Sequence, residues 1–64
     1  MNIGENIKKI RTKAGLTQDE LAQAVGVHQS MIGLIETGRK LPSLMLAIDI
    51  AKTCGCTVNE ICED

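Results

Sequence analysis

The segment from residue 17 to residue 38 constrains the fold of this chain more than any other. Two short stretches of helical spacing lie there, with only a glycine-containing joint between them. Helices that cross steeply need a tight turn and a close contact beside it. Ala22 is small enough to allow that contact, and Gly26 accepts the positive φ angle of such a turn. Ile32 is placed to pack back into the angle, so the segment predicts a helix-turn-helix, whose second helix can enter a DNA major groove.

The N-terminal third of the chain predicts a helix before this segment. Asn2 and Glu5 have the spacing of a capping box, in which each side chain bonds to the backbone of the other. Apolar residues then recur at spacings of four, three and four, which gives one buried stripe of Ile3, Ile7, Ile10 and Ala14. Thr17 and Glu20 repeat the capping-box spacing at the start of the second helix.

The C-terminal third predicts two more helices, and no segment predicts a strand. Pro42 marks a loop, and Ser43 can cap a fourth helix that runs to about residue 54. We expect the buried face of that helix to consist of Leu44, Ala47, Ile48 and Ala51. Thr57 and Glu60 then form a third capping-box pair, which begins a short fifth helix.

Length and composition exclude several classes of function. A chain of 64 residues forms one domain, and without aromatic residues it offers no base-stacking platform for single strands. No apolar run approaches the roughly 18 residues of a membrane helix, and no apolar signal core follows the N-terminus. We therefore expect a cytoplasmic protein. One histidine, no phosphate-binding glycine loop and little volume for a substrate pocket argue against an enzyme, and no cofactor is expected.

The charges are unevenly distributed along the chain, although the net charge is only −1. Residues 1–40 carry six basic and four acidic side chains, a net charge of +2. Residues 41–64 carry one basic and four acidic side chains, a net charge of −3. The difference predicts a basic side and an acidic side of the molecule.

The stretch TQDELAQAVGVHQSMIGLIETGRKLPS resembles the helix-turn-helix of the phage repressor and Cro family, also called the XRE family. The residues that carry the resemblance are Gln18, Ala22, Gly26, Val27, Ile32, Ile35, Glu36, Gly38 and Pro42. IGENIKKIRTKAGLT resembles the first helix of that family, and LAIDIAKTCGCTVNEI resembles its fourth and fifth helices.

This resemblance implies a compact all-α, five-helix bundle of the lambda-repressor-like DNA-binding type. It would be a single domain over residues 1–64, with the helix-turn-helix at about 17–37. The implied function is sequence-specific binding of double-stranded DNA by a transcriptional repressor, bacterial or phage-encoded, that acts by occupancy. Operators of this class are usually two half-sites about 34 Å apart that are read by a two-fold dimer.

The third helix is expected to lie in the groove and to read bases. Gln29 is the best candidate, because its amide can both donate to and accept from the major-groove edge of adenine. Ser30 can bond to several bases, and His28 either touches DNA or is simply exposed at the helix start. Leu34 can only pack on a thymine methyl, and Gly33 offers no side chain, so both depart from the polar residues usual in the family.

Other residues are expected to hold the DNA backbone. The resemblance implies that the helix start at Thr17 and Gln18 grips one phosphate, although Thr17 also serves as a cap. Thr37 is the last residue of the outer face of the third helix, and we expect it to contact the DNA backbone as well. Arg39 and Lys40 follow in a loop and are natural phosphate clamps, with two solvated charges as the alternative.

The resemblance also implies a structural ion pair between Arg11 and Glu36, which would fix the recognition helix against the first helix. Cys54, Cys56 and Cys62 permit a metal site, but their spacing is not a common structural-zinc pattern. Relatives usually carry apolar residues at these positions. We therefore expect small buried hydrophobic side chains and no metal.

The fourth helix carries more apolar residues than one buried face needs. Leu41, Met45 and Leu46 lie outside the expected core stripe, which suggests a surface for self-association into a homodimer. An exposed apolar face at Met31 and Leu34 leaves an alternative open. The chain could be a protein-interaction module, such as an antitoxin-like adaptor, that keeps the fold with weak or no DNA binding.

Overall fold

The computed structural model describes residues 2–64, and five α-helices account for most of that range. In chain order they are α1 (Ile3–Lys13), α2 (Gln18–Val25), α3 (Gln29–Glu36), α4 (Leu44–Cys54) and α5 (Val58–Cys62). No strand occurs among these residues, so the predicted all-α, five-helix fold is confirmed. Within the same residues, every helix is too short or too polar to cross a membrane.

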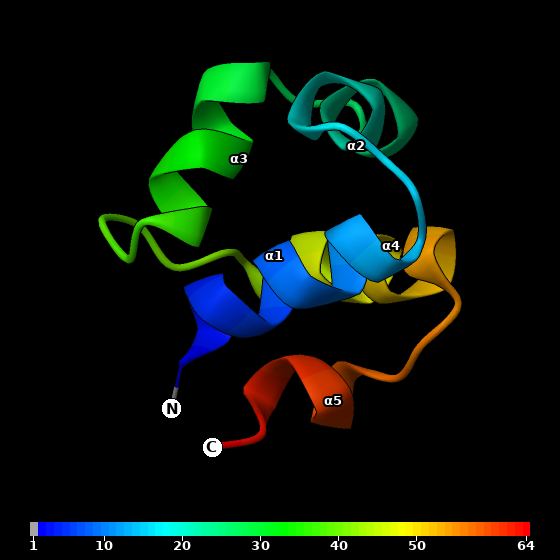
Figure 1. Cartoon of the computed structure of the whole chain (residues 1–64). Coiled ribbons are helices and arrows are strands. Elements are labelled where there is room, and N and C mark those ends of the chain that lie inside the picture. Colours follow the sequence, from blue (N-terminus) through cyan, green and yellow to red (C-terminus); the bar gives the residue numbers. More distant parts are fainter. Residues whose placement is uncertain (1) are drawn as a thin grey trace.

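The helices are arranged around α1 and α4, which cross the middle of the molecule (Figure 1). α2 and α3 lie on one side of this pair, and α5 lies on the other. α1 contacts α3, α4 and α5, while α2 packs on α3 and α4. Because α3 packs mainly on α1 and α2, its remaining side is turned away from the rest of the chain.

The core consists of aliphatic side chains from all five helices. The largest fully buried side chains are Ile7, Leu21, Ile32, Ile35, Ile50 and Ile61, and the smaller Ala22, Ala47 and Ala51 fill the space between them. Burial of each large aliphatic side chain stabilises the fold by about 1.5–3 kcal/mol relative to an exposed position. The core is therefore able to hold a chain without aromatic residues or disulfides.

The predicted helix caps are present at three of four positions. At α2, the Thr17 hydroxyl accepts from the Glu20 N–H at 3.1 Å, and a Glu20 carboxylate oxygen accepts from the Thr17 N–H at 2.9 Å. The Ser43 and Thr57 side chains accept from the backbone N–H of the third residue of α4 and α5, but among the described residues only α2 has the complete capping box, so the one expected at Thr57 and Glu60 is half formed. The capping box expected at Asn2 is wrong: the Asn2 side chain makes no cap, because its backbone is not in the extended conformation that the other three caps adopt.

Three predictions about burial are also wrong. Ala14 is exposed, because α1 ends at Lys13 and Ala14 lies past its last turn. The buried face of α4 is formed by Ala47, Ile50 and Ala51, so Leu44 is 69% exposed and Ile48 only half-buried. Leu46, predicted to be outside the core, is half-buried and packs against it. The errors in α4 share one source, because its inward stripe keeps Ala47 and Ala51 but is turned toward Ile50 and Leu46 rather than toward Leu44 and Ile48.

Candidate nucleic-acid interface

The turn between α2 and α3 has the geometry that the sequence predicted. Gly26 ends α2 with φ +76°, and the Val27 N–H donates to the Ala22 carbonyl at 3.0 Å. Ala22 is 1% exposed and Ile32 is fully buried, so both side chains lie in the angle between the two helices. The turn thereby fixes the direction in which α3 leaves α2.

The two faces of α3 differ sharply in burial. Ile32, Ile35 and Glu36 face inward and are buried. The residues expected to read bases lie on the other face: His28, Gln29, Ser30 and Leu34 are exposed, and Gly33 is half-buried. Four of these five residues are therefore accessible from solvent, and His28 precedes α3 as its N-cap. Their contacts with bases stay a prediction.

Gly33 is not required by packing. A Cβ atom added at this position would approach only the Oε1 atom of Gln18, at 3.9 Å, which is an ordinary van der Waals contact. The structure therefore has room for a methyl group at Gly33, beside the amide oxygen of Gln18.

The start of α2 offers backbone donors for a phosphate. Thr17 satisfies the N–H of Glu20, so the N–H groups of Gln18 and Asp19 are the first-turn donors that point beyond the helix end. The Gln18 side chain is partly committed, because its Nε2 donates to Oε1 of Glu36 at 3.0 Å. The second N–H of this amide can still donate a hydrogen bond, and its oxygen can still accept one.

Arg11 and Glu36 form the predicted ion pair. Arg11 Nε donates to Glu36 Oε2 at 2.7 Å and Nη2 donates to Oε1 at 3.1 Å, a bidentate arrangement. A third guanidinium nitrogen, Nη1, donates to the Leu16 carbonyl at 2.8 Å. The hydrogen bond to Glu36 raises the pKa of Arg11, which stays charged. With Gln18, the pair joins the ends of α1 and α3 to the start of α2.

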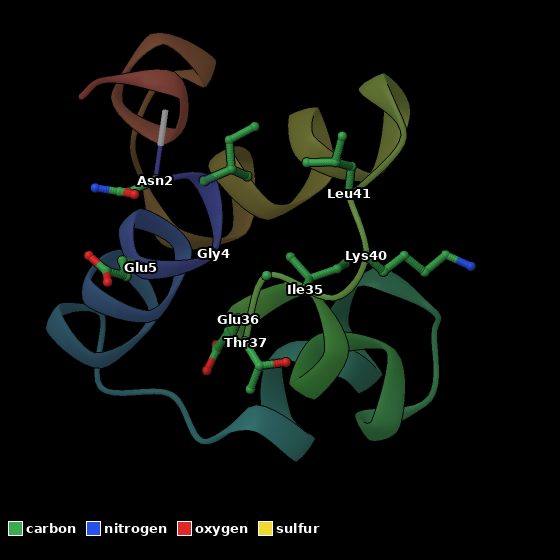
Figure 2. Close-up of a pocket in the computed structure, with 10 residues that line it drawn as sticks. Asn2, Gly4, Glu5, Ile35, Glu36, Thr37, Lys40 and Leu41 are labelled. Carbon is green, nitrogen blue, oxygen red and sulfur yellow. The ribbon is translucent and has the colours of Figure 1, made fainter.

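Gly4 is a site residue that sequence reasoning missed. A Cβ atom on Gly4 would lie 2.4 Å from the Ile35 carbonyl oxygen and 2.8 Å from that of Glu36. The start of α1 therefore approaches the end of α3 as closely as only glycine allows, and Figure 2 shows this junction. The available signal was a glycine inside the first turn of a helix, where it costs stability unless packing needs it.

The loop after α3 is tied to the helix end. Gly38 has φ +81°, and the backbone N–H groups of Arg39 and Lys40 both donate to the Leu34 carbonyl, at 2.9 and 3.2 Å. The two basic side chains are exposed, and Lys40 extends outward in Figure 2. Thr37 is exposed too, but its hydroxyl donates to the carbonyls of Gly33 and Leu34 at 3.0 and 3.2 Å. The hydroxyl hydrogen is therefore already used within α3, which counts against the expected donation from Thr37 to a phosphate.

The remaining candidates are the cysteines. Cys54 and Cys56 are half-buried and pack against the core, as expected, but Cys62 is exposed. Cys62 is the last residue of the short helix α5, and its side chain is open to solvent. Within residues 2–64, no three potential ligand side chains come together as a metal site.

A hollow of about 300 Å³ lies between the start of α1 and the end of α3, partly open to solvent.

Comparison with known proteins agrees with this architecture. A sequence profile of the helix-turn-helix family HTH_3 matches residues 7–61. The chain is 40% identical over 55 residues to an uncharacterised HTH-type transcriptional regulator of Archaeoglobus fulgidus, a match that covers 86% of this chain and 79% of the relative.

Solved structures of regulators share the fold. The clp gene regulator ClgR from Corynebacterium glutamicum aligns with a TM-score of 0.91 at 28% identity, over 95% of this chain and 65% of ClgR. SinR, the master regulator for biofilm formation, was solved in complex with DNA and aligns with a TM-score of 0.88 at 27% identity, over 95% of this chain and 98% of that one. The chain therefore belongs to the helix-turn-helix family of DNA-binding transcriptional regulators.

Proposed function

We propose that this chain binds a specific sequence of double-stranded DNA by placing α3 in the major groove, and that it represses transcription in the cytoplasm by occupying its operator. The observation that carries the proposal is the open outer face of α3. Gln29 and Ser30 are exposed at its start, while the opposite ridge is closed against α1 and α2. SinR, which is similar in fold, was solved in complex with DNA. The family and these neighbours are DNA-binding regulators rather than enzymes.

Two groups of donors near α3 support docking on the DNA backbone. One consists of the first-turn N–H groups of α2, beside Gln18, whose side chain bonds to Glu36 at the end of α3. The other consists of the exposed side chains of Arg39 and Lys40, which follow Gly38. A phosphate contacted by each group would fix the orientation of α3 before any base is read. Each neutralised phosphate should add roughly −0.9 to the slope of log affinity against log salt.

Selection of bound duplexes from a random pool at moderate salt tests the proposal directly. We expect a short palindromic consensus, because a two-fold dimer reads two half-sites. A pool that shows no enrichment, with weak binding to every duplex, would overturn it.

A pair of matched variants separates base reading from backbone docking. Gln29→Ala should lose about 1–3 kcal/mol of discrimination at one base position and keep most of its affinity for random duplexes. Arg39→Ala should weaken binding to all sequences alike and lower the salt slope by about one unit. Both residues are exposed, so neither change should alter thermal stability appreciably. Identical behaviour of the two variants on specific and random duplexes would contradict the assigned roles.

We further propose that the chain acts as a homodimer, at least on DNA, through an apolar patch formed by Leu41, Leu44 and Met45. These side chains are 73%, 69% and 67% exposed, and all three belong to residues 41–45, at and just before the start of α4. A patch of this kind on a small domain is typical of a contact surface. Leu46 is excluded from the patch because it packs against the core.

Sedimentation at micromolar concentration, with and without operator DNA, tests the dimer. Leu44→Glu should shift the population toward monomer. Thr53→Glu adds the same charge at an exposed position of the same helix and should leave the population unchanged. A wild-type chain that sediments as a monomer both on and off DNA would remove the dimer from the proposal.

One observation favours a second function. Leu34 is 41% exposed on the outer face of α3, and Met31 beside it is half-buried. An apolar side chain at this position suits a protein partner better than a base edge. If duplex selection fails, a protein-interaction module of the adaptor type becomes the better description.

A further inference from the structure

Two cysteines share a hollow on the side of the molecule away from α3. The hollow has a volume of about 270 Å³ and lies between the end of α1 and the connection from α4 to α5. Its wall is formed by Ile10, Lys13 and Ala14 on one side and by Cys54, Cys56 and Glu60 on the other. The DNA-binding surface uses none of these residues.

The backbone holds the two thiols in place. Gly55 lies between them in the left-handed conformation, with φ +74°, and ends α4. The Gly55 N–H donates to the Lys52 carbonyl at 3.3 Å, and the Cys56 N–H donates to the Ala51 carbonyl at 2.9 Å. This paired bonding fixes both residues that flank the glycine, and both cysteines pack against the core. The turn therefore places both cysteine residues in the lining of the same hollow.

The number of ligands limits the kind of ion that fits. No group of three or more histidine, cysteine or acidic side chains converges anywhere in residues 2–64. A structural zinc ion needs four ligands, usually cysteine or histidine, so zinc does not match this pair. Thiolates are soft donors that favour Cu(I), an ion that is stable with two sulfur ligands.

We propose that Cys54 and Cys56 bind one Cu(I) ion as a pair of thiolate ligands in this hollow. Each thiol gives up a proton and forms a sulfur–copper bond, so one ion binds, two protons are released and no atom changes oxidation state. The resulting site carries a net charge of −1. The wall of the hollow carries one positive charge, on Lys13, and one negative charge, on Glu60.

The protonation of the free protein agrees with this scheme. Burial raises the pKa of both thiols, and the charge of Cys56 raises the pKa of Cys54 further. Two neighbouring residues act in opposite directions, since Arg11 lowers the pKa of Cys54 and Glu60 raises that of Cys56. Both groups are therefore thiols at neutral pH, which protects them from oxidation when no ion is bound.

Competition for Cu(I) against the chromogenic chelator bathocuproine disulfonate, under reducing and anaerobic conditions, tests the proposal. The wild-type chain should take up one Cu(I) per molecule. Cys54→Ser and Cys56→Ser should each weaken binding by more than the roughly 10–100-fold that loss of an outer-shell partner costs at a metal site. Cys62→Ser is the matched control and should bind like the wild type, since Cys62 is exposed and lies outside the hollow. In weak buffer at neutral pH, a pH indicator should report close to two protons released per ion.

Two outcomes would overturn the site. One is equal loss in Cys62→Ser and Cys54→Ser, which would show non-specific binding to any thiol. The other is an unchanged affinity in Cys54→Ser or Cys56→Ser. Cys54→Ala and Cys56→Ala keep the pocket apolar and replace any serine variant whose helical circular dichroism shows unfolding. Since the readout is copper binding and not DNA binding, the result is independent of the proposed regulatory function.

Discussion

The two sides of α3 follow opposite rules. On the inner side, Ile35 and Glu36 are buried against α1. Their carbonyl oxygens lie too close to Gly4 to leave room for a Cβ atom there. On the outer side, Gln29 and Leu34 are exposed. The inner side fixes the position of the helix, so substitutions on the outer side should cost little stability.

The two glycines that lie within helices show the same contrast between the inner and outer sides of α3. Gly4 lies in α1 and Gly33 in α3, and neither has a positive φ angle. A side chain on Gly4 would overlap backbone atoms, which cannot move without moving α3. A side chain on Gly33 would meet only the end of a glutamine side chain at an ordinary distance. The same residue type is required at one position and dispensable for packing at the other.

The largest effect should come from removal of Glu36. Its side chain is 3% exposed and holds Arg11 and Gln18 at once, so Glu36→Ala leaves a guanidinium without its partner at a site only 12% exposed. Loss of one member of a buried pair costs about 3–5 kcal/mol, which we expect in the free energy of unfolding measured by urea denaturation. Glu36→Gln retains an acceptor for Arg11 and should cost less. A loss below about 1 kcal/mol for the alanine variant would show that the inner side of α3 does not depend on this pair.

A smaller loss should follow from Gly4→Ala. The added methyl group would lie 2.4 Å from the Ile35 carbonyl oxygen, so α1 and α3 must separate. Overpacking of this kind typically costs about 1–3 kcal/mol, measurable as a lower urea midpoint with an unchanged slope. A variant as stable as the wild type would mean that the junction adapts freely. The contrast between the two sides of α3 would then lose its physical basis.

How much of this the sequence could predict depends on the kind of feature. The turn and the exposed face of α3 were predictable, because Ala22, Gly26 and Ile32 act through local spacing. The buried pair of Arg11 and Glu36 came only from the family resemblance, since the two residues lie 25 positions apart.

The features that sequence reasoning missed depend on packing between helices. Gly4 carries no sequence signal for the helix that it meets. Leu44 has the correct spacing for the core but lies at the exposed start of α4. Gln18 bonds to Glu36 across two helices, and nothing in the spacing of the two residues predicts that bond. Helical period identifies which residues share a face, but only the crossing of helices decides which face is buried.

The smallest effect, and the only gain, should come from Gly33→Ala. Alanine stabilises a helix interior by up to about 1 kcal/mol relative to glycine, and the added methyl group has room beside Gln18. We therefore expect a slightly higher urea midpoint for the free protein, opposite in sign to Gly4→Ala. Binding of both variants to the selected duplex then sharpens the comparison. If Gly33→Ala gains stability but loses DNA affinity, the absence of a side chain at Gly33 allows α3 to lie close to the groove. The outer side of the helix is then constrained by DNA binding rather than by folding. If the urea midpoint falls instead, packing around Gly33 does require a glycine, contrary to our expectation for the outer side of α3.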